Sequence, residues 1–455
     1  MHRRALLALT LLLAALAPAG RAIAAPTMEI GMADDRLLFS DGGAAAVRDW
    51  ASAGVDVVRI HARWDAVSPQ PDATVPPEGF LPENANDPQY RWGVLDRAVG
   101  LVRGAGMRAV LSVTGPGPVW ASQIPGHHNR RWKPDPRFFG AFARAVAQRY
   151  RAQVDRYLIW NEPNVPLWLE PQRSCDRRHH CTAYAADLYR ELVLAATPAI
   201  QAADPGAQVV IATLAPIGSD RPATNSPLRP LAFLREMACV DRRLHALRSG
   251  ACRGFTPVPA DGISLHPHGV KTPPDGHDPS RDDAKLGDLR RAERLVDSLV
   301  ARGRIAASTT PLPFYLTEFG YQTDPPDPYV GVPPLTQAAW LTRADEIAWL
   351  DPRVANLTQY VWRDEPVYRS SHGKDYSGWQ SGVFYADGTA KPSLTAFRFP
   401  FLVKRGRGRS ATIWGQVRPG GAHAVTVYVD GRVLTTATTD DQGAFGARVT
   451  LPAGS

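Results

Sequence analysis

The sequence feature that most constrains the fold is a regular alternation of short apolar segments with longer amphipathic ones from residue 28 to about 399. Apolar runs of strand length occur at Met28–Met32, Val55–Ile60, Arg108–Val113, Val154–Trp160, Gln208–Leu214, Gly262–His266, Phe314–Thr317 and Leu357–Trp362. Apolar residues recur between them at the 3.6-residue spacing of helices, as in Trp92–Arg103, Arg137–Tyr150, Ala183–Ala203, Leu286–Arg302 and Thr336–Leu350. Eight strand–helix units predict an α/β fold, a (β/α)8 TIM barrel over residues 25–404. An open doubly wound sheet is less favoured, because no G-x-G-x-x-G follows the first strand.

The sequence changes character near residue 405. Lys404–Arg409 is a basic, glycine-rich joint, and short alternating segments follow it. Two of these segments flank Asp430-Gly431, a dipeptide that strongly favours a hairpin turn. We predict a small C-terminal all-β domain over residues 405–455. It is short for a free-standing sandwich, so it either packs on the barrel or is incomplete. A glycan-binding role would require exposed aromatic residues, for which the segment offers Trp414, Tyr428 and Phe445.

The first residues have the pattern of a secretory signal peptide. His2-Arg3-Arg4 is a basic start, Ala5–Leu16 is apolar, and Ala22-Ile23-Ala24 provides the small residues typical of a cleavage site. The apolar run is too short to cross a bilayer, although a retained anchor helix is an alternative. We therefore predict a signal peptide over residues 1–24, a secreted mature protein and no membrane span in the mature chain.

The predicted export bears on the four cysteines, which are Cys175, Cys181, Cys239 and Cys252. An even number in an oxidising compartment favours disulfides. Of the three possible pairings, the simplest joins Cys175 to Cys181 and Cys239 to Cys252, because each bond then closes a short loop. Metal binding is a weaker alternative because the spacing is not C-x2-C.

The formal net charge of +8 does not by itself indicate a nucleic-acid partner. Nearly all of the 52 basic residues are arginine, and they are scattered among acidic residues, as in Asp288-Leu-Arg-Arg-Ala-Glu-Arg294. A nucleic-acid-binding protein would cluster the positive charge on one face. We predict no nucleic-acid partner, and the oligomeric state stays open.

Two glutamates stand out because each directly follows a predicted strand. Glu162 lies in Tyr157-Leu-Ile-Trp-Asn-Glu-Pro-Asn164, after the fourth strand, and Glu318 lies in Phe314-Tyr-Leu-Thr-Glu-Phe-Gly-Tyr321, at the end of the seventh. These strands are nearly opposite in an eight-stranded barrel, so both carboxylates are expected at one rim and in one cavity. Such a pair suits glycoside hydrolysis, in which one carboxyl protonates the leaving oxygen and the other attacks the sugar carbon.

Neighbouring residues suggest different environments for the two carboxylates. Arg59 ends the second strand and His266 ends the sixth, and both are expected to keep Glu318 ionised. Asn161 is expected to bind a sugar hydroxyl. The aromatic residues predicted on the same rim are Trp64, Trp120, Trp132, Trp168, Trp362 and Trp379. We assign Trp64, Trp120 and Trp362 to substrate binding, because flat rings pack on the apolar faces of sugars.

With these residues the sequence resembles glycoside hydrolase clan A, the retaining (β/α)8 glycosidases. The run Ile159-Trp-Asn-Glu-Pro-Asn164 with Trp168 is most similar to family 39, and next to family 5. Further matches are Trp64, Pro69, Tyr90, Trp92-Gly-Val-Leu-Asp96, Pro118-Val-Trp120, Ser264-Leu-His266 and Asp387-Gly-Thr-Ala-Lys-Pro392. The resemblance implies that Glu162 is the acid/base, that Glu318 is the nucleophile, and that Asn161, Arg59 and His266 support them.

One position departs from that resemblance. Many relatives carry a tyrosine two residues after the histidine of strand six, where it hydrogen-bonds the nucleophile, and this chain has His268 there. Either His268 or Tyr321 takes that role, or the nucleophile is tuned differently. The sugar and the linkage therefore stay open.

Three functions follow from these motifs. The first is a secreted retaining glycosidase with a poly- or oligosaccharide substrate and no cofactor. The second is a barrel of the cell surface that binds glycans without cleaving them. The third is metal-dependent hydrolysis, suggested by His266-Pro-His268 and His127-His128. We predict no metal site, because neither histidine pair has a carboxylate at ligand spacing.

Overall fold

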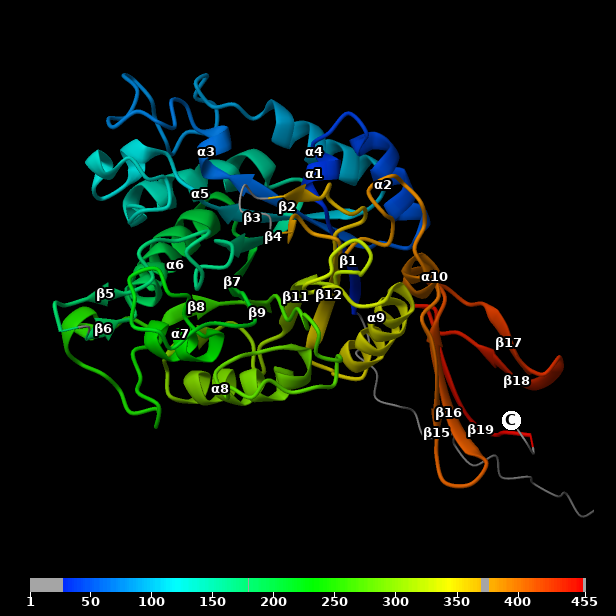
Figure 1. The fold of residues 1–455 in the computed structure, drawn as a ribbon. Coiled ribbons are helices and arrows are strands. Elements are labelled where there is room, and N and C mark those ends of the chain that lie inside the picture. Colours follow the sequence, from blue (N-terminus) through cyan, green and yellow to red (C-terminus); the bar gives the residue numbers. More distant parts are fainter. Residues whose placement is uncertain (1–27, 179, 370–375, 453–455) are drawn as a thin grey trace, which may run out of the picture.

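A closed barrel of parallel strands forms the centre of the molecule in the computed structural model, which describes residues 28–178, 180–369 and 376–452 (Figure 1). Around the barrel the order is β1 (Glu29–Ala33), β2 (Val57–Arg63), β3 (Arg108–Thr114), β4 (Val154–Ile159), β7 (Gln208–Leu214), β9 (Gly262–Leu265), β11 (Phe314–Phe319) and β12 (Val354–Tyr360). β12 pairs with β1 and closes the ring. The predicted barrel is confirmed, and each predicted strand overlaps one of these strands.

Helices follow the strands and cover the outside of the barrel (Figure 1). They are α1 (Asp35–Leu38), α2 (Gly43–Ser52), α3 (Trp64–Val67), α4 (Gly93–Gly104), α5 (Pro136–Tyr150), α6 (Tyr184–Ala203), α7 (Pro230–Met237), α8 (Leu289–Ala301), α9 (Pro334–Trp349) and α10 (Pro392–Arg398). α5 shows how sequence sets these elements. Asp135 caps its first turn, Pro136 occupies its first position, and Phe139, Phe142 and Val146 bury one face.

The barrel interior changes from apolar to polar along the strands. Val57, Val110, Leu158, Val210 and Tyr315 form a buried cluster of their own on five of the strands. Side chains alternate between the two faces of a strand, so Arg59 and His61 share the inward face of β2 with Val57. The carboxyl end of the barrel therefore holds charged groups above an apolar layer.

Antiparallel strands follow the barrel, as predicted. β15 (Phe401–Arg405), β16 (Ser410–Gln416) and β19 (Ala444–Thr450) form one sheet, and β17 (Ala424–Val429) and β18 (Arg432–Thr438) form a hairpin. The hairpin turns at Asp430-Gly431, where both residues have positive φ (49° and 76°). The sheet begins at Phe401, inside the range predicted for the barrel.

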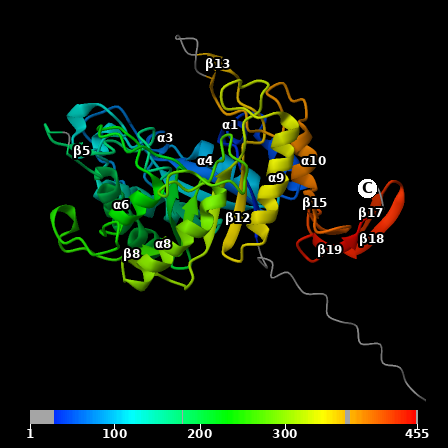
Figure 2. The same cartoon turned by 60° about the horizontal axis from the view of Figure 1, so that its bottom comes forward.

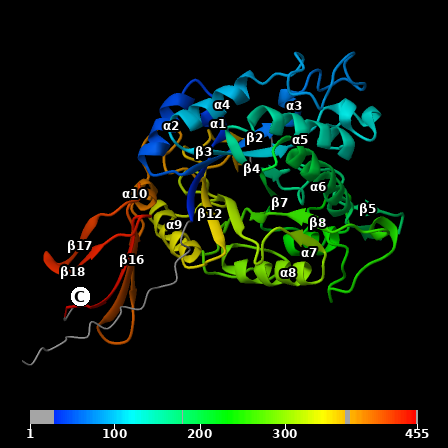
Figure 3. The same ribbon diagram turned by 180° about the vertical axis from the view of Figure 1, so that it is seen from behind.

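Of these strands, β15 lies beside α9 and α10, and the β17–β18 hairpin extends away from them (Figure 2). The C-terminal strands lie on the opposite side of the molecule from β5 (Ser174–Cys175) and β6 (Cys181–Thr182) (Figure 3). The buried guanidinium of Arg418 lies 2.7 Å from Asp345 on α9 and also donates to the Phe397 carbonyl. Trp414 and Phe445 are buried and only Tyr428 of the three candidate aromatics is exposed, so the described contacts are those of a segment packed on the barrel.

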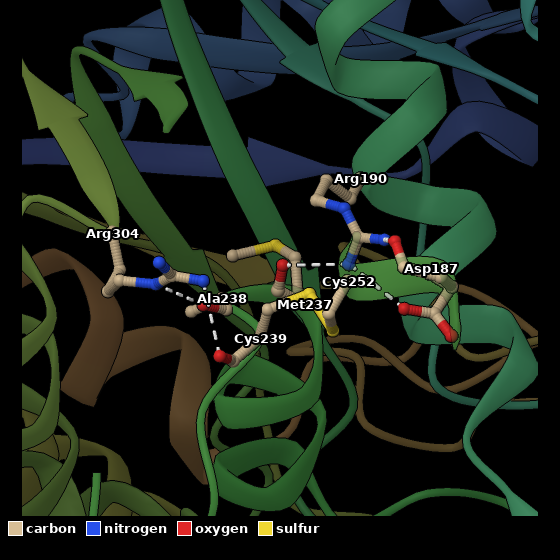
Figure 4. The surroundings of a disulfide bond; sticks show 8 residues. Asp187, Arg190, Met237, Ala238, Cys239, Cys252 and Arg304 are labelled. Atoms are coloured by element: carbon tan, nitrogen blue, oxygen red, sulfur yellow. Dashed lines mark hydrogen bonds and ion pairs between the residues drawn. A yellow bond between two sulfur atoms is a disulfide. The ribbon is translucent and has the colours of Figure 1, made fainter. Parts of the chain in front are cut away.

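Both disulfides pair as predicted, Cys175 with Cys181 and Cys239 with Cys252. The second lies beside α6, where Arg190 bridges Asp187 and the Met237 carbonyl (Figure 4). The bond therefore closes the loop after α7 on itself, and Arg190, which also donates to the Ala251 carbonyl, holds that loop against α6. The predicted signal peptide lies within residues 1–27, outside the described residues. In the part of the chain that the structure describes, no helix combines the length and apolarity needed to traverse a bilayer.

Candidate active site

Glu318 is the penultimate residue of β11, and its carboxylate faces Arg59 and His266 at the carboxyl end of the barrel. Its Oε1 atom lies 2.6 Å from Nη2 of Arg59. Its Oε2 atom lies 3.6 Å from Nδ1 of His266 and 3.5 Å from Nε2 of His268. Burial alone would raise the pKa of Glu318, but the charges of His266 and Arg59, together with His268, hold that pKa well below its usual range. Glu318 is therefore a buried carboxylate that stays ionised.

Arg59 connects this carboxylate to the loop after β4. It is almost fully buried, and its Nη1 atom donates to Oδ1 of Asn161 (3.1 Å). The same Nη1 atom lies 2.7 Å from Nε2 of His61. Arg59 therefore lies close to Glu318, as predicted, and also orients the amide of Asn161.

Glu162 follows β4 on a strained turn. Trp160 and Glu162 both have φ in the left-handed region, at 63° and 39°, which non-glycine residues rarely adopt. Backbone hydrogen bonds hold the turn, from Glu162 to the Thr213 carbonyl and from Asn161 to the Thr114 hydroxyl, both 3.0 Å long. Such strain persists only where the surroundings fix it, often at functional sites.

The two carboxylates meet at His266. Its Nδ1 atom lies 3.0 Å from Oε1 of Glu162, and its Nε2 atom lies 3.1 Å from the hydroxyl of Thr317. One oxygen of Glu162, one oxygen of Glu318 and a ring nitrogen of His266 all lie within 4.8 Å of one another. The environments differ, because Glu318 is paired with an arginine whereas Glu162 keeps 17% of its side chain exposed.

These three groups also have the spacing of metal ligands. Carboxylate oxygens and imidazole nitrogens are common ligands of divalent metal ions, and Glu162, Glu318 and His266 bring two carboxylates and one imidazole together. However, the guanidinium of Arg59 already neutralises Glu318 at 2.6 Å and would repel a cation there. The donor set therefore suits a carboxylate paired with an arginine better than a metal ion.

Of the two residues considered for the position beside Glu318, the structure places His268 there, with its Nε2 atom 3.5 Å from the carboxylate. Tyr321 is buried against Phe319 and Trp340, and its hydroxyl donates to the Thr272 carbonyl at 2.9 Å. The Tyr321 side chain therefore stabilises the loop after β9.

The predicted stacking role of three tryptophans is not supported, because a buried ring offers no face to a sugar. Trp64, Trp120 and Trp362 are at most 2% exposed. Trp64 stacks on Phe142, Trp120 donates to the Pro69 carbonyl, and Trp362 packs on Phe384 and Phe397. The sequence places them after strands, but it does not show that helices and loops cover them.

Other aromatic side chains lie closer to Glu318. Tyr360 is the last residue of β12. Burial raises the pKa of the Tyr360 hydroxyl, and the negative charge of Glu318 raises it further. Trp379 is half-buried, with its ring 5.1 Å from His268 and 5.2 Å from Tyr360. Tyr360 and His61 were absent from the predicted site. Strand alternation could have identified His61, which is two residues after Arg59, but Tyr360 has no comparable signal.

The fold and the site together define a class of protein. It is a (β/α)8 barrel with one glutamate after its fourth strand and a second at the carboxyl end of its seventh. The fold has solved counterparts, including a family 39 glycoside hydrolase from the gut symbiont Bacteroides cellulosilyticus WH2, with a TM-score of 0.52 and 13% identity over 94% of this chain and 82% of that one. A glucosidase from Croceicoccus marinus has a TM-score of 0.50 and 15% identity over 89% and 76%. No protein-family model and no curated protein sequence matches this chain. The fold implied by the resemblance to clan A is confirmed.

Proposed function

We propose that the protein is a secreted retaining glycosidase in which Glu318 is the nucleophile and Glu162 the acid/base. The observation that carries the proposal is the pair of carboxylate oxygens within 4.8 Å in unlike surroundings. Retaining enzymes hold their carboxyl groups about 5–5.5 Å apart, whereas inverting enzymes need about 6.5–9.5 Å to admit a water molecule. The two similar structures are described as a glycoside hydrolase and a glucosidase.

In the first step a Glu318 oxygen attacks the anomeric carbon while Glu162 gives its proton to the glycosidic oxygen. The carbon–oxygen bond breaks, the leaving sugar departs with that proton, and the remaining sugar is esterified to Glu318. In the second step Glu162 removes a proton from water, whose oxygen attacks the same carbon and releases Glu318. Asn161 offers its amide nitrogen to a sugar hydroxyl, because Arg59 occupies its oxygen.

Secretion is supported by the leader pattern and by the two disulfides, which form and persist in oxidising compartments. A carbohydrate is the proposed partner, and the half-buried Trp379 is the aromatic ring best placed to pack on it.

The test is hydrolysis of a panel of activated aryl glycosides and plant or bacterial wall polysaccharides. Glu318→Gln should lose several orders of magnitude in kcat, whereas the exposed Glu78→Gln control should keep it. Glu162→Gln should release one equivalent of an activated phenol rapidly and then stall, because that leaving group needs no proton whereas water activation does.

Two product analyses complete the test. Proton NMR of the first sugar released should show the anomeric configuration of the substrate. Azide added to Glu318→Ala should give a glycosyl azide of opposite configuration. Full activity in Glu318→Gln would overturn the assignment. Glycan binding without turnover across the panel would instead establish the non-catalytic binding barrel.

A further inference from the structure

A hydrogen-bonded chain of side chains lies behind Arg59. His61 is two residues further along β2, so its side chain enters the barrel on the same face as Arg59. Its Nε2 atom lies 2.7 Å from Nη1 of Arg59, and its Nδ1 atom lies 2.6 Å from Oδ2 of Asp35. Asp35 is the first residue of α1, and its carboxylate also accepts the backbone N–H of His61 at 3.3 Å. The order is Asp35, His61, Arg59, Glu318.

The donors and acceptors of this chain admit one arrangement of protons. A guanidinium only donates hydrogen bonds, so Nε2 of His61 must accept from Arg59. The ring proton is then on Nδ1, where it is donated to Asp35. His61 is therefore a neutral imidazole whose tautomer is set by Asp35. A second proton on the ring would remove the acceptor and place two cations in contact.

Nη1 of Arg59 thus has two acceptors, His61 and Asn161, whereas Nη2 has Glu318. Three directed bonds fix both the position and the rotation of the planar group. Without an acceptor on the His61 side, a buried donor of Arg59 would lose its hydrogen bond, and the guanidinium would be free to turn away from Glu318.

We propose that Asp35 and His61 are positioning residues that aim Arg59 at the nucleophile. The inference rests on the proposed glycosidase function for its kinetic effect, but the proton arrangement can be tested without any activity. The structure offers a matched pair of variants, because the amide oxygen of glutamine can replace Nε2 as an acceptor whereas leucine cannot.

His61→Leu should lower kcat by about 100-fold with little change in KM, because a small displacement of a catalytic group costs that much. His61→Gln should recover most of that loss. Asp35→Ala should resemble His61→Leu, and the double variant should be no worse than either, because both act through Arg59. Melting temperatures identify any variant that fails to fold. Wild-type kcat in folded His61→Leu, or equal losses in the leucine and glutamine variants, would overturn the proposal.

The second measurement is 15N NMR of the histidine side chains, with the His61 signals assigned by their absence in His61→Gln. A protonated Nδ1 and an unprotonated, hydrogen-bonded Nε2 at pH 7 are expected. The opposite tautomer, or an imidazolium, would overturn the proposal even in an active enzyme. The expected tautomer in a protein that cleaves no glycoside would contradict the proposed function alone and leave the chain from Asp35 to Arg59 supported.

Discussion

The Nη2 atom of Arg59 lies 2.6 Å from the Oε1 atom of Glu318, and both side chains are nearly inaccessible to solvent. A carboxylate buried in a barrel would ordinarily bind a proton, because burial disfavours its charge. The guanidinium and the two histidines reverse that tendency and hold the pKa of Glu318 well below its usual range. The pairing thus determines the protonation state on which the proposed chemistry depends.

Replacing Arg59 should change the pH dependence of activity. Glu318 must be ionised to act as the proposed nucleophile. Arg59→Leu removes a charge that lowers the pKa of Glu318, so this pKa should rise. Activity should then be lost at a higher pH on the acid side, and kcat at the optimum should fall about 100-fold. Profiles of kcat/KM against pH check this, with Arg59→Lys, which keeps the charge, expected to shift less. An acid limb that does not move in Arg59→Leu would contradict the electrostatic role.

Variants of Trp379 and Trp362 should distinguish a tryptophan that binds substrate from one that only packs in the core. Trp379→Ala removes a half-buried ring beside His268 and should raise KM about 3- to 10-fold, the value of one aromatic contact. Trp362→Phe loosens a buried contact with Phe397 and should lower the melting temperature without changing KM. Steady-state kinetics and thermal melts test both expectations. A raised KM in Trp362→Phe with an unchanged KM in Trp379→Ala would show that Trp362 binds the substrate.

The disulfide in Figure 4 should contribute more stability than its counterpart. Cys239 and Cys252 are 13 residues apart, whereas Cys175 and Cys181 are separated by six. Constraining a longer loop removes more entropy from the unfolded chain, so the Cys239→Ala/Cys252→Ala double variant should lose about 2–4 kcal/mol and Cys175→Ala/Cys181→Ala less. Urea unfolding under non-reducing conditions measures both. Equal losses would show that loop length does not set the difference.

Arg418 should be needed to hold the C-terminal strands against α9. Arg418→Met leaves the buried carboxylate of Asp345 without its cation, which costs about 3–5 kcal/mol. The Asp345→Leu/Arg418→Met double variant should recover most of the loss, because no isolated charge remains. Urea unfolding and proteolysis after residue 400 report the change. A stable single variant would mean that other contacts hold the strands.

The sequence predicted what depends on periodicity and spacing along the chain. Alternating apolar runs predicted the barrel strands, and the positions of Glu162 and Glu318 after two of them predicted that the carboxylates would meet. Short separations predicted the disulfide pairs. Each of these features follows from local pattern combined with the geometry of a closed barrel.

Features that depend on distant contacts were not predictable. The burial of Trp64 and Trp120 depends on which helices cover them, and the contact between His61 and Asp35 joins residues 26 positions apart. The choice of His268 over Tyr321 depends on the direction of each side chain. None of these properties has a signature in the order of residues alone.

The inward alternation of Val57, Arg59 and His61 makes β2 intolerant of length changes. Inserting or deleting one residue at the start of β2, ahead of Val57, would turn all three side chains towards the helices and bring Val58 and Ile60 inside. The lumen would then lose the guanidinium of Arg59 and the imidazole of His61 together, while the strand itself could still pair with β1 and β3. In this segment, only changes of two residues at a time preserve which side chains enter the barrel.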